Sequence, residues 1–374
     1  MSNVFWCKTC LNMSTRPRIE FNEDKICNAC QWSQEKKTFN WDDREKELAS
    51  LIEKFRSTDG GYDCIVPVSG GKDGSYIAHT LKTKFGLKPL CVTITPALQT
   101  DLGRRNLDAF KNSGFDVLQL DLNPSILQEL NKIGLIDFGF PYLGWLIAIQ
   151  TAVIRVSVDM KIPLIFYGED GEVEYGGSTE TKNNPVIDID YQRRVWFEGH
   201  AGLALDRLVK HRDDVLRFFQ FPTADELAAA NTFITTWSYY EPWDSYRNYL
   251  VAKDFCGMHE ADQTNAGTFT NFSQNDQLLY PLHVYLMYLK FGFGRATQDV
   301  GIEIRRGAMK RAQGLRLVKL YDGLFPAELA SKYCQYYELS KPELYAAIFK
   351  HANKNLFEVD EMNGSVIRLF DHEG

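Results

Sequence analysis

Between residues 43 and 167, segments with helical spacing of apolar residues alternate with short, continuous apolar runs. Leu48, Leu51, Ile52 and Phe55 recur at helical spacing and predict a helix over 43–56. Short apolar runs predict buried strands at 62–68, 89–95, 116–122 and 163–167, and longer stretches predict helices at 74–85, 104–112, 125–133 and 143–160. Strands that alternate with helices form a parallel sheet covered on both faces, because each crossover is right-handed. The pattern predicts an α/β fold with a doubly wound parallel sheet.

The pattern changes on both sides of this core. Residues 1–40 are polar, contain paired cysteines and lack a helical period, whereas the chain after residue 180 has longer helical stretches such as 204–219 and 277–291. We see no internal repeat and no low-complexity linker. The sequence therefore predicts an N-terminal knuckle over 1–40, a nucleotide-binding core over 41–180 and a mostly helical substrate-binding region over 181–374.

Composition narrows the class of protein. The 374 residues are 44% hydrophobic and 24% charged, as in soluble globular proteins, and a net charge of -7 argues against a bulk nucleic-acid binder. The N-terminus shows no secretory signal. The most apolar window, 142–158, contains Gln150 and Arg155 and is shorter than the ~20 residues that a membrane span needs. We expect a cytoplasmic protein with no membrane span.

Two cysteine pairs form the first chemical motif. Cys7-x2-Cys10 and Cys27-x2-Cys30 can present four thiolates to one tetrahedral ion, and Zn²⁺ is the usual occupant of such a closed sulfur site. A closed site leaves no open coordination position, so we expect the zinc to be structural. Two dithiol redox pairs or an iron–sulfur cluster are the alternatives. The remaining thiols are scattered and are expected to pack in the core; they are Cys64, Cys91, Cys256 and Cys334.

A glycine-rich turn, SGGKDGS at 69–75, joins the first predicted strand to its helix. Its backbone N–H groups and the helix N-terminus would face an anion, and its lysine and serines add donors. The turn matches neither the P-loop nor the dinucleotide fingerprint. It resembles the PP-loop of N-type ATP pyrophosphatases, which cleave ATP between the α and β phosphates and adenylate a substrate oxygen. The resemblance assigns ATP phosphates to Ser69, Gly70, Gly71, Lys72, Asp73, Gly74 and Ser75. Asp73 is the expected organiser of Mg²⁺ or pyrophosphate.

An acidic stretch, 169–174, follows the last core strand. Ligands of parallel sheets bind beyond the carboxyl ends of strands, so we expect these acids to face the glycine-rich turn. Carboxylates beside phosphates favour Mg²⁺ between them, and the candidates for holding it or for steering an attacking amine are Glu169, Glu172 and Glu174. A solvated acidic turn is the alternative. Gly176 and Gly177 predict close backbone approach to a ligand.

Basic residues are frequent in the last third of the chain. Arg295, Arg305 and Arg306 suit a diphosphate or a carboxylate, although a solvated basic face is the alternative. Together with KFGFGRAT at 290–297, DGLFP at 322–326, the cysteine pairs and the PP-loop, the chain resembles the N-acetyl sugar amidotransferase family of bacterial surface-polysaccharide and nonulosonic acid biosynthesis. One departure is Asp170, where the family pattern leads us to expect asparagine.

The resemblance implies an ATP-dependent reaction on the acetamido group of a UDP-linked N-acetyl sugar, in lipopolysaccharide O-antigen synthesis. ATP would adenylate the amide oxygen, and ammonia would displace AMP to leave an acetamidino group. Arg295, Arg305 and Arg306 would bind the sugar diphosphate or a uronate carboxylate. Residue 2 is serine and no cysteine lies in a nucleophile elbow, so we expect a separate glutaminase. The resemblance suggests partners like the glutaminase and cyclase subunits of imidazole glycerol phosphate synthase.

Two other functions fit parts of the sequence. A tRNA-thiolating PP-loop enzyme can carry a zinc knuckle and a similar loop, but it would need reactive cysteines near the loop or a cluster, together with a basic RNA surface. A nucleotide-binding module without turnover would not need Lys72, Asp73 and the acids at 169–174 together. Both alternatives rank below the amidotransferase.

Overall fold

The computed structural model describes residues 4–208, 213–360 and 365–370. Five parallel strands form a sheet in the order β3-β2-β1-β4-β5. The strands are β1 Cys64–Pro67, β2 Pro89–Ile94, β3 Val117–Leu120, β4 Leu164–Tyr167 and β5 Phe233–Thr236. The helices are α1 Asn28–Glu35, α2 Trp41–Phe55, α3 Lys72–Phe85, α4 Asp101–Asn112, α5 Pro124–Ile133, α6 Leu143–Met160, α7 Gly171–Tyr175, α8 Ile189–Tyr191, α9 His200–Asp206, α10 Ala224–Ala230, α11 Ser245–Cys256, α12 Leu279–Phe291, α13 Arg295–Arg305, α14 Arg311–Tyr321, α15 Ala330–Tyr337 and α16 Lys341–Phe349.

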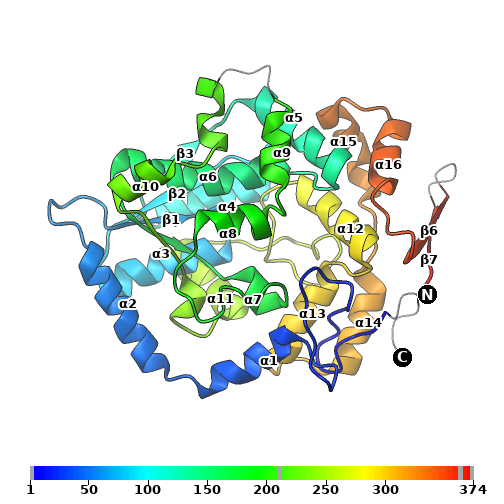
Figure 1. The fold of residues 1–374 in the computed structure, drawn as a ribbon, viewed down its shortest axis with the longest axis horizontal. Helices are drawn as coiled ribbons and strands as arrows, with labels where there is room; N and C mark the ends of the chain where they lie inside the picture. The colour runs from blue at the N-terminus through cyan, green and yellow to red at the C-terminus, as the bar shows by residue number, and fades with distance from the viewer. Residues whose placement is uncertain (1–3, 209–212, 361–364, 371–374) are drawn as a thin grey trace.

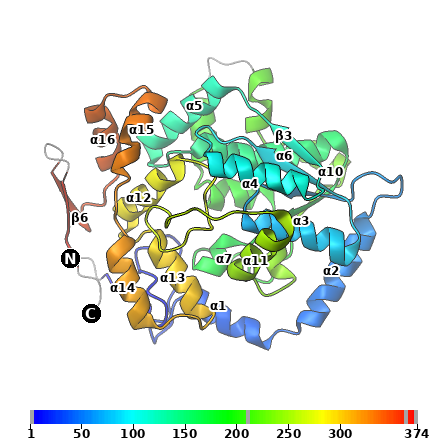
Figure 2. The ribbon, with the colours of Figure 1, turned by 180° about the vertical axis from the view of Figure 1, so that it is seen from behind.

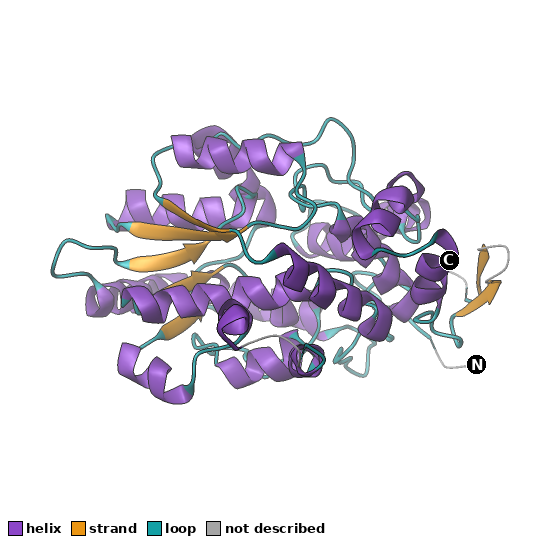
Figure 3. Ribbon diagram, turned by 90° about the horizontal axis from the view of Figure 1, so that it is seen from above, coloured by secondary structure: helices purple, strands orange, loops and turns teal. Residues whose placement is uncertain are grey.

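Helices cover both faces of the sheet (Figure 3), which confirms the predicted doubly wound fold. Successive strand residues point to opposite faces. Ile65 of β1 packs into the cluster that contains α5 and α6, whereas its neighbours Cys64 and Val66 pack into the cluster that contains α2, α3 and α4. On this second face α3 lies beside α11 (Figure 2). Burial on both faces explains why these strands read as continuous apolar runs rather than as alternating ones.

The strand order places a topological switch point between β1 and β4. The chain runs outward from β1 through β2 to β3, and then returns to the other side of β1 to form β4 and β5. The connections from β1 and from β4 run to opposite sides, so a crevice forms between the loops that follow these two strands. It lies at the carboxyl edge of the sheet, where ligands of such folds bind. The loop after β1 is the glycine-rich turn, and the loop after β4 is the acidic stretch.

The fifth strand lies outside the range predicted for the core. Phe233–Thr236 pairs in parallel with β4, so the sheet extends beyond residue 180 into the region predicted to be helical. The strand is short, and its last two residues are threonines, which weakens its apolar signal. The predicted helix at 204–219 is also different: the structure has the end of α9 and a 3₁₀ segment, Asp213–Phe219, while 209–212 lie outside the described residues.

α6 is a core helix. By length and composition it could cross a membrane, with a mean hydropathy of 1.4, but 67% of the helix is buried inside the fold. Ile147, Ala152 and Val153 are fully buried against the sheet. The structure therefore agrees with the predicted buried helix.

The C-terminal region forms a third cluster beside the sheet. α12, α15 and α16 share one apolar core, and a two-stranded antiparallel ribbon, β6 Phe357–Asp360 and β7 Ser365–Arg368, adds to it. The N-terminal knuckle lies against α13 and α14 (Figure 1). Leu11 packs with Val300 of α13 and Val318 of α14, which fixes the knuckle to the C-terminal region.

Candidate active site and metal centre

A cavity of about 270 Å³ opens at the carboxyl ends of β1, β2 and β4. The glycine-rich turn lines one side, and Thr93 and Ile94 of β2 line another. Segment 270–276 and helix α13 complete the cavity from the C-terminal region. We call this space the nucleotide cavity. It brings the predicted phosphate loop together with residues more than 190 positions further along the chain.

Two glycines allow the phosphate loop to adopt its shape. Gly70 has φ +78°, and a Cβ there would lie 2.4 Å from the backbone nitrogen of Leu107. A Cβ at Gly74 would lie 2.5 Å from the carbonyl oxygen of Pro67, so the first turn of α3 rests directly on β1. Residues at the start of α3 line the cavity, and the N–H groups of this first helical turn are candidates for an anion site.

Most of the predicted phosphate-loop residues line this cavity. They are Ser69, Gly71, Lys72, Asp73 and Gly74. Gly70 lies behind the loop against α4. Ser75 is fully buried in α3, and its hydroxyl oxygen has no hydrogen-bond partner among the described residues.

Lys72 and Asp73 form an ion pair at the N-terminus of α3. The other carboxylate oxygen of Asp73 accepts a hydrogen bond from Asn248 Nδ2 at 3.0 Å. Asn248 is fully buried on α11 and was not identified from the sequence. A single buried asparagine 175 residues from its partner leaves no periodic or motif signal.

The acidic stretch after β4 points in several directions. Glu169 enters the nucleotide cavity, where it accepts a hydrogen bond from the Tyr175 hydroxyl at 2.9 Å. Burial raises the pKa of the Glu169 carboxyl group, and the nearby charge of Asp73 raises it further. Two neighbouring carboxylates that repel each other beside an anion site form a set of hard oxygen ligands suited to a divalent cation.

Asp170 is the N-cap residue of α7, and its side chain is buried. Its side chain accepts hydrogen bonds from the backbone N–H groups of Glu172 and Val173 and from the Thr181 hydroxyl. Burial raises its pKa to about 6. An asparagine oxygen could accept the same backbone bonds, so the departure from the family pattern leaves the cap intact.

Glu172 and Glu174 contact the N-terminal knuckle rather than the nucleotide cavity. Arg18 donates two hydrogen bonds of 2.9 Å to Glu172. Lys36 pairs with Glu174 at 2.6 Å, and the Trp32 indole donates to the same carboxylate at 2.9 Å. The structure thus brings only Glu169 of the three predicted acids to the phosphate loop.

The two glycines after α7 also face the knuckle. Gly176 has φ +93°, and a Cβ there would lie 2.9 Å from Asn12 Nδ2. Asn28 Nδ2 donates to the carbonyl oxygen of Gly177 at 2.8 Å. At Gly176 the approaching group is the knuckle, whereas a Cβ at Gly177 would clash with the Glu172 carboxylate. Neither glycine lines the nucleotide cavity, and their approach to a ligand stays a prediction.

The three predicted arginines lie at different places. Arg295 lines the nucleotide cavity, pairs with Asp299 at 2.8 Å and donates to the Tyr280 hydroxyl at 3.0 Å. Arg305 and Arg306 line a second hollow of about 300 Å³ between the knuckle and α13. This hollow shares three lining residues with the nucleotide cavity, so the two spaces adjoin; they are Tyr175, Ser245 and Ile302.

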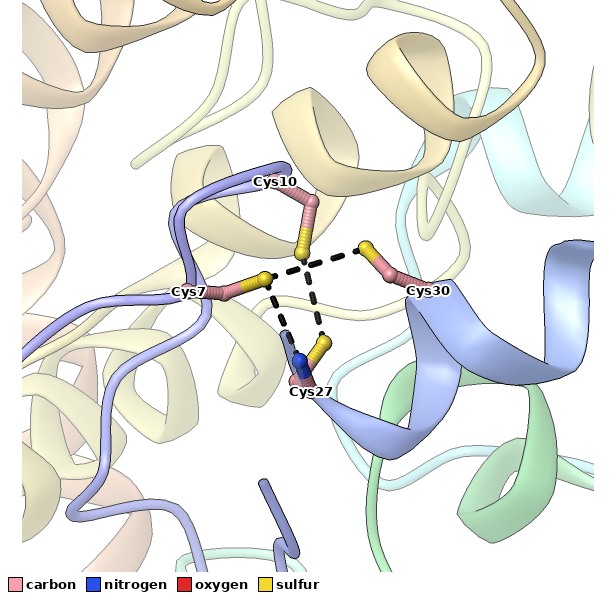
Figure 4. A group of neighbouring side chains, drawn as sticks. All are labelled: Cys7, Cys10, Cys27 and Cys30. Atoms are coloured by element: carbon pink, nitrogen blue, oxygen red, sulfur yellow. Dashed lines mark hydrogen bonds between the residues drawn. The ribbon is translucent and has the colours of Figure 1, made fainter. Parts of the chain in front are cut away.

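Four cysteines converge at the metal centre (Figure 4). Cys7, Cys10, Cys27 and Cys30 are buried, and their sulfurs all lie within 4.8 Å of one another. The Cys7–Cys30 and Cys10–Cys27 separations are 3.9 and 3.5 Å. A tetrahedron with Zn–S bonds of about 2.3 Å has sulfur–sulfur edges of about 3.8 Å. The cluster is therefore a metal-binding site with the dimensions of a single tetrahedral ion.

N–H groups around the four cysteines are placed to donate hydrogen bonds to their sulfurs. The backbone N–H groups of Thr9 and Cys27 point to the Cys7 sulfur at 3.4 and 3.3 Å, and Asn12 Nδ2 points to the Cys27 sulfur at 3.5 Å. Arg305 lies close enough to interact electrostatically with Cys10 and Cys30. Such N–H donors and a nearby cation offset the negative charge of a four-thiolate site.

The other cysteines are not activated. Cys64, Cys91 and Cys256 are buried in the core, and burial raises the pKa of each thiol, to about 11 for Cys256. Cys334 is partly buried beside α12 and α16. None of these four thiols lines the nucleotide cavity.

Comparison with known proteins gives a match in the C-terminal region. Residues 266–370 match the family described as "LPS biosynthesis protein WbpG-like, C-terminal domain". An uncharacterised protein of Methanocaldococcus jannaschii is 34% identical over 89 residues, which are 24% of this chain; the chain spans about a third, 32%, of that relative. The solved U34-tRNA thiolase NcsA from Methanococcus maripaludis, with its [4Fe-4S] cluster, is 11% identical, with a TM-score of 0.32 over 74% of this chain and 80% of the thiolase.

The WbpG-like match contains segment 270–276, Arg295 and Asp299, which line the nucleotide cavity. It also contains KFGFGRAT and DGLFP, the stretches on which the family resemblance rests. The C-terminal region of the chain is therefore similar to the WbpG-like lipopolysaccharide biosynthesis proteins, which supports the family resemblance found in the sequence.

Proposed function

We propose that this protein is an ATP-dependent amidotransferase that converts the acetamido group of a UDP-linked N-acetyl sugar into an acetamidino group during lipopolysaccharide O-antigen synthesis. One observation carries the proposal. The anion site at the start of α3 and residues of the WbpG-like domain line the same cavity. ATP and a glycan precursor can therefore meet there.

The chemistry proceeds in two substitutions. The amide oxygen of the acetamido group attacks the α-phosphorus of ATP, the bond to the β-phosphate breaks, and pyrophosphate leaves. Ammonia then uses its lone pair to form a bond to the activated carbon. AMP leaves with the former amide oxygen, and the nitrogen loses a proton. Adenylation is needed because an amide oxygen is a poor leaving group, whereas AMP is a good one.

The chain's own groups position the phosphates. The N–H groups at the start of α3 and the Lys72 ammonium bind the β and γ phosphates, and Asn248 holds Asp73 in place. Asp73 and Glu169 fit Mg²⁺, because their carboxylates are neighbours in the cavity and repel each other without a cation. The ion would neutralise phosphate charge there.

The second hollow suits the nucleotide part of the sugar substrate. Arg306 and Lys37 line it, as do the aromatic rings of Trp41 and Trp243. Cations match a diphosphate, and indole rings match a planar base. Because this hollow adjoins the nucleotide cavity at Tyr175, a sugar attached to such a diphosphate would extend toward Arg295.

The predicted acids that lie outside the nucleotide cavity, Arg305 and the cysteine site are assigned structural roles. We propose that Glu172 and Glu174 hold α7 to the knuckle through Arg18 and Lys36, and that Arg305 compensates the charge of the cysteine site. We propose Zn²⁺ for this site, since its sulfur spacing fits one ion. A multi-iron cluster would hold its cysteine sulfurs farther apart.

Ammonia is expected from a separate glutaminase. Glutamine hydrolysis needs an activated nucleophile. Four of the described thiols are in the metal cluster, Cys64, Cys91 and Cys256 are buried with raised pKa values, and Cys334 lies away from the nucleotide cavity. Thiolation of tRNA would need reactive cysteines or a cluster beside the phosphate loop, and no described cysteine lines the nucleotide cavity, which weighs against that function.

Pyrophosphate and AMP release test the proposal. The purified protein is incubated with ATP, Mg²⁺ and ammonium, together with either UDP-linked diacetamido sugars or bulk tRNA. We expect release that depends on both the sugar nucleotide and ammonium. Release stimulated by tRNA but by no sugar nucleotide would reject the amidotransferase in favour of the thiolating enzyme.

A further inference from the structure

A third hollow, of about 210 Å³, lies behind α7. It is enclosed by the knuckle at 16–18, the segment 139–146, Glu172 of α7, the segment 195–200 and the facing sides of α12 and α13. None of its lining residues lines the nucleotide cavity. We call it the rear pocket. It is therefore a separate space, for which the proposed reaction gives no role.

Two cations in the rear pocket lack an anionic partner. Arg16 forms no side-chain hydrogen bond or ion pair with any described residue, and its Nη1 is buried. Its guanidinium stacks over Phe293 at 5.6 Å. Among the described residues, the Lys290 ammonium donates a hydrogen bond only to the Phe138 carbonyl oxygen, at 3.1 Å. Burial lowers the pKa of Arg16 to about 10 and also lowers that of Lys290.

The charge of the lining is unbalanced. Arg16, Arg18 and Lys290 are opposed by Glu172 and Glu198, and Arg18 already pairs with both carboxylates, at 2.9 and 3.5 Å. The two histidines add no charge at neutral pH, because burial lowers the pKa of His200 and brings that of His283 to about 3. One positive charge therefore remains. His283 Nδ1 is also buried without a partner.

Partly buried cations without an anionic partner are costly, so this arrangement is expected to have a ligand. We propose that the rear pocket binds a small organic acid, whose carboxylate lies between Arg16 and Lys290. A single net charge matches a monoanion better than a phosphate dianion, and a guanidinium fork matches a carboxylate. Phe140, Trp196 and Phe293 supply aromatic walls for the apolar side or the ring of the acid.

Calorimetric titration of the full chain without ATP tests this proposal independently of the amidotransferase reaction. The probes are glucuronate and benzoate as carboxylates, glucose as the neutral match for glucuronate, and inorganic phosphate. The variants are Arg16→Met and Lys290→Met, with Arg105→Met, an exposed arginine on α4, as the matched control. Both pocket variants should fold, because each removes a partly buried cation that has no anionic partner.

We expect at least one carboxylate to bind saturably, and glucose not to bind. Arg16→Met and Lys290→Met should each weaken this binding by about tenfold or more, whereas Arg105→Met should leave it unchanged. Carboxylate binding that survives both pocket variants would overturn the proposal, as would failure of both acids to bind. Tighter binding of phosphate than of either acid would overturn the assignment to a carboxylate.

Discussion

Glu169 and Asp73 are neighbours in the nucleotide cavity, and the charge of Asp73 is second only to burial among the causes that raise the pKa of the Glu169 carboxyl group. The two residues follow different strands, β4 and β1, and meet because these strands are adjacent in the sheet. Such a pair is unfavourable in the free protein and becomes favourable when a divalent cation lies between the carboxylates.

Glu169→Gln removes one carboxylate from this pair. We expect pyrophosphate release to fall by about 100-fold or more, because phosphate charge is then poorly neutralised. Glu172→Gln is the matched control, since Glu172 pairs with Arg18 outside the cavity and its variant should retain most activity. Equal losses in the two variants would contradict the separation of the two acids, and both are read by steady-state pyrophosphate assays across Mg²⁺ concentrations.

Lys72→Ala tests the phosphate site at the start of α3. The variant should lose pyrophosphate release by about 100-fold or more, since the ammonium no longer neutralises the phosphates, while its zinc content and circular dichroism stay unchanged. Lys84→Ala, at the other end of the same helix and half exposed, should remain active. Wild-type turnover by Lys72→Ala, or its failure to fold, would count against the phosphate assignment.

Cys10→Ser tests the metal centre. Loss of one thiolate should reduce bound zinc, measured by elemental analysis, and lower the melting temperature, because the knuckle is anchored through this cluster to α13. Ser33→Ala, on α1 near the cluster, should keep both zinc and stability. If chelation of the metal leaves the melting temperature of the wild-type protein unchanged, the structural role is wrong.

Asp322 gives a pH-dependent prediction. Its buried carboxylate accepts hydrogen bonds from Gly294 N–H at 2.8 Å and from the Thr297 hydroxyl at 2.6 Å, and burial raises its pKa to about 6. The folded state therefore holds the proton more tightly than the unfolded chain, so ionisation costs stability as pH rises from about 4 to 7. This cost is absent in Asp322→Asn.

The stability of Asp322→Asn relative to wild type should consequently fall by about 2 kcal/mol when the pH changes from 7 to 4. Urea unfolding at the two pH values measures this difference. A constant difference would show that Asp322 does not carry the raised pKa.

The elements that bury a continuous apolar face were predictable from the sequence. β1, β2, β4 and α6 lie close to their predicted ranges, since strands covered on both faces and a core helix leave long apolar runs. β5 was missed because its Thr235 and Thr236 are polar yet buried. Thr235 satisfies its hydroxyl by donating to the Pro185 carbonyl oxygen, a contact that no local pattern reveals.

The residues of the candidate site also fall into a predictable group and an unpredictable group. Motifs within one loop, the PP-loop and the cysteine pairs, were found because their function depends on local spacing. The direction of each acid after β4 was not predictable, because α7 is short and the knuckle, more than 130 residues earlier, provides Arg18 and Lys36 as competing partners. Asn248 and the rear pocket depend on tertiary contacts alone.

The most direct test follows one oxygen atom. A UDP-linked N-acetyl sugar that carries a heavy oxygen isotope in its acetamido group is converted with ATP, Mg²⁺ and ammonium, and the products are analysed by mass spectrometry. The account predicts that the label appears in AMP and that the sugar gains an NH group in place of that oxygen. Label that stays in the sugar while AMP is released unlabelled would contradict the proposed adenylation.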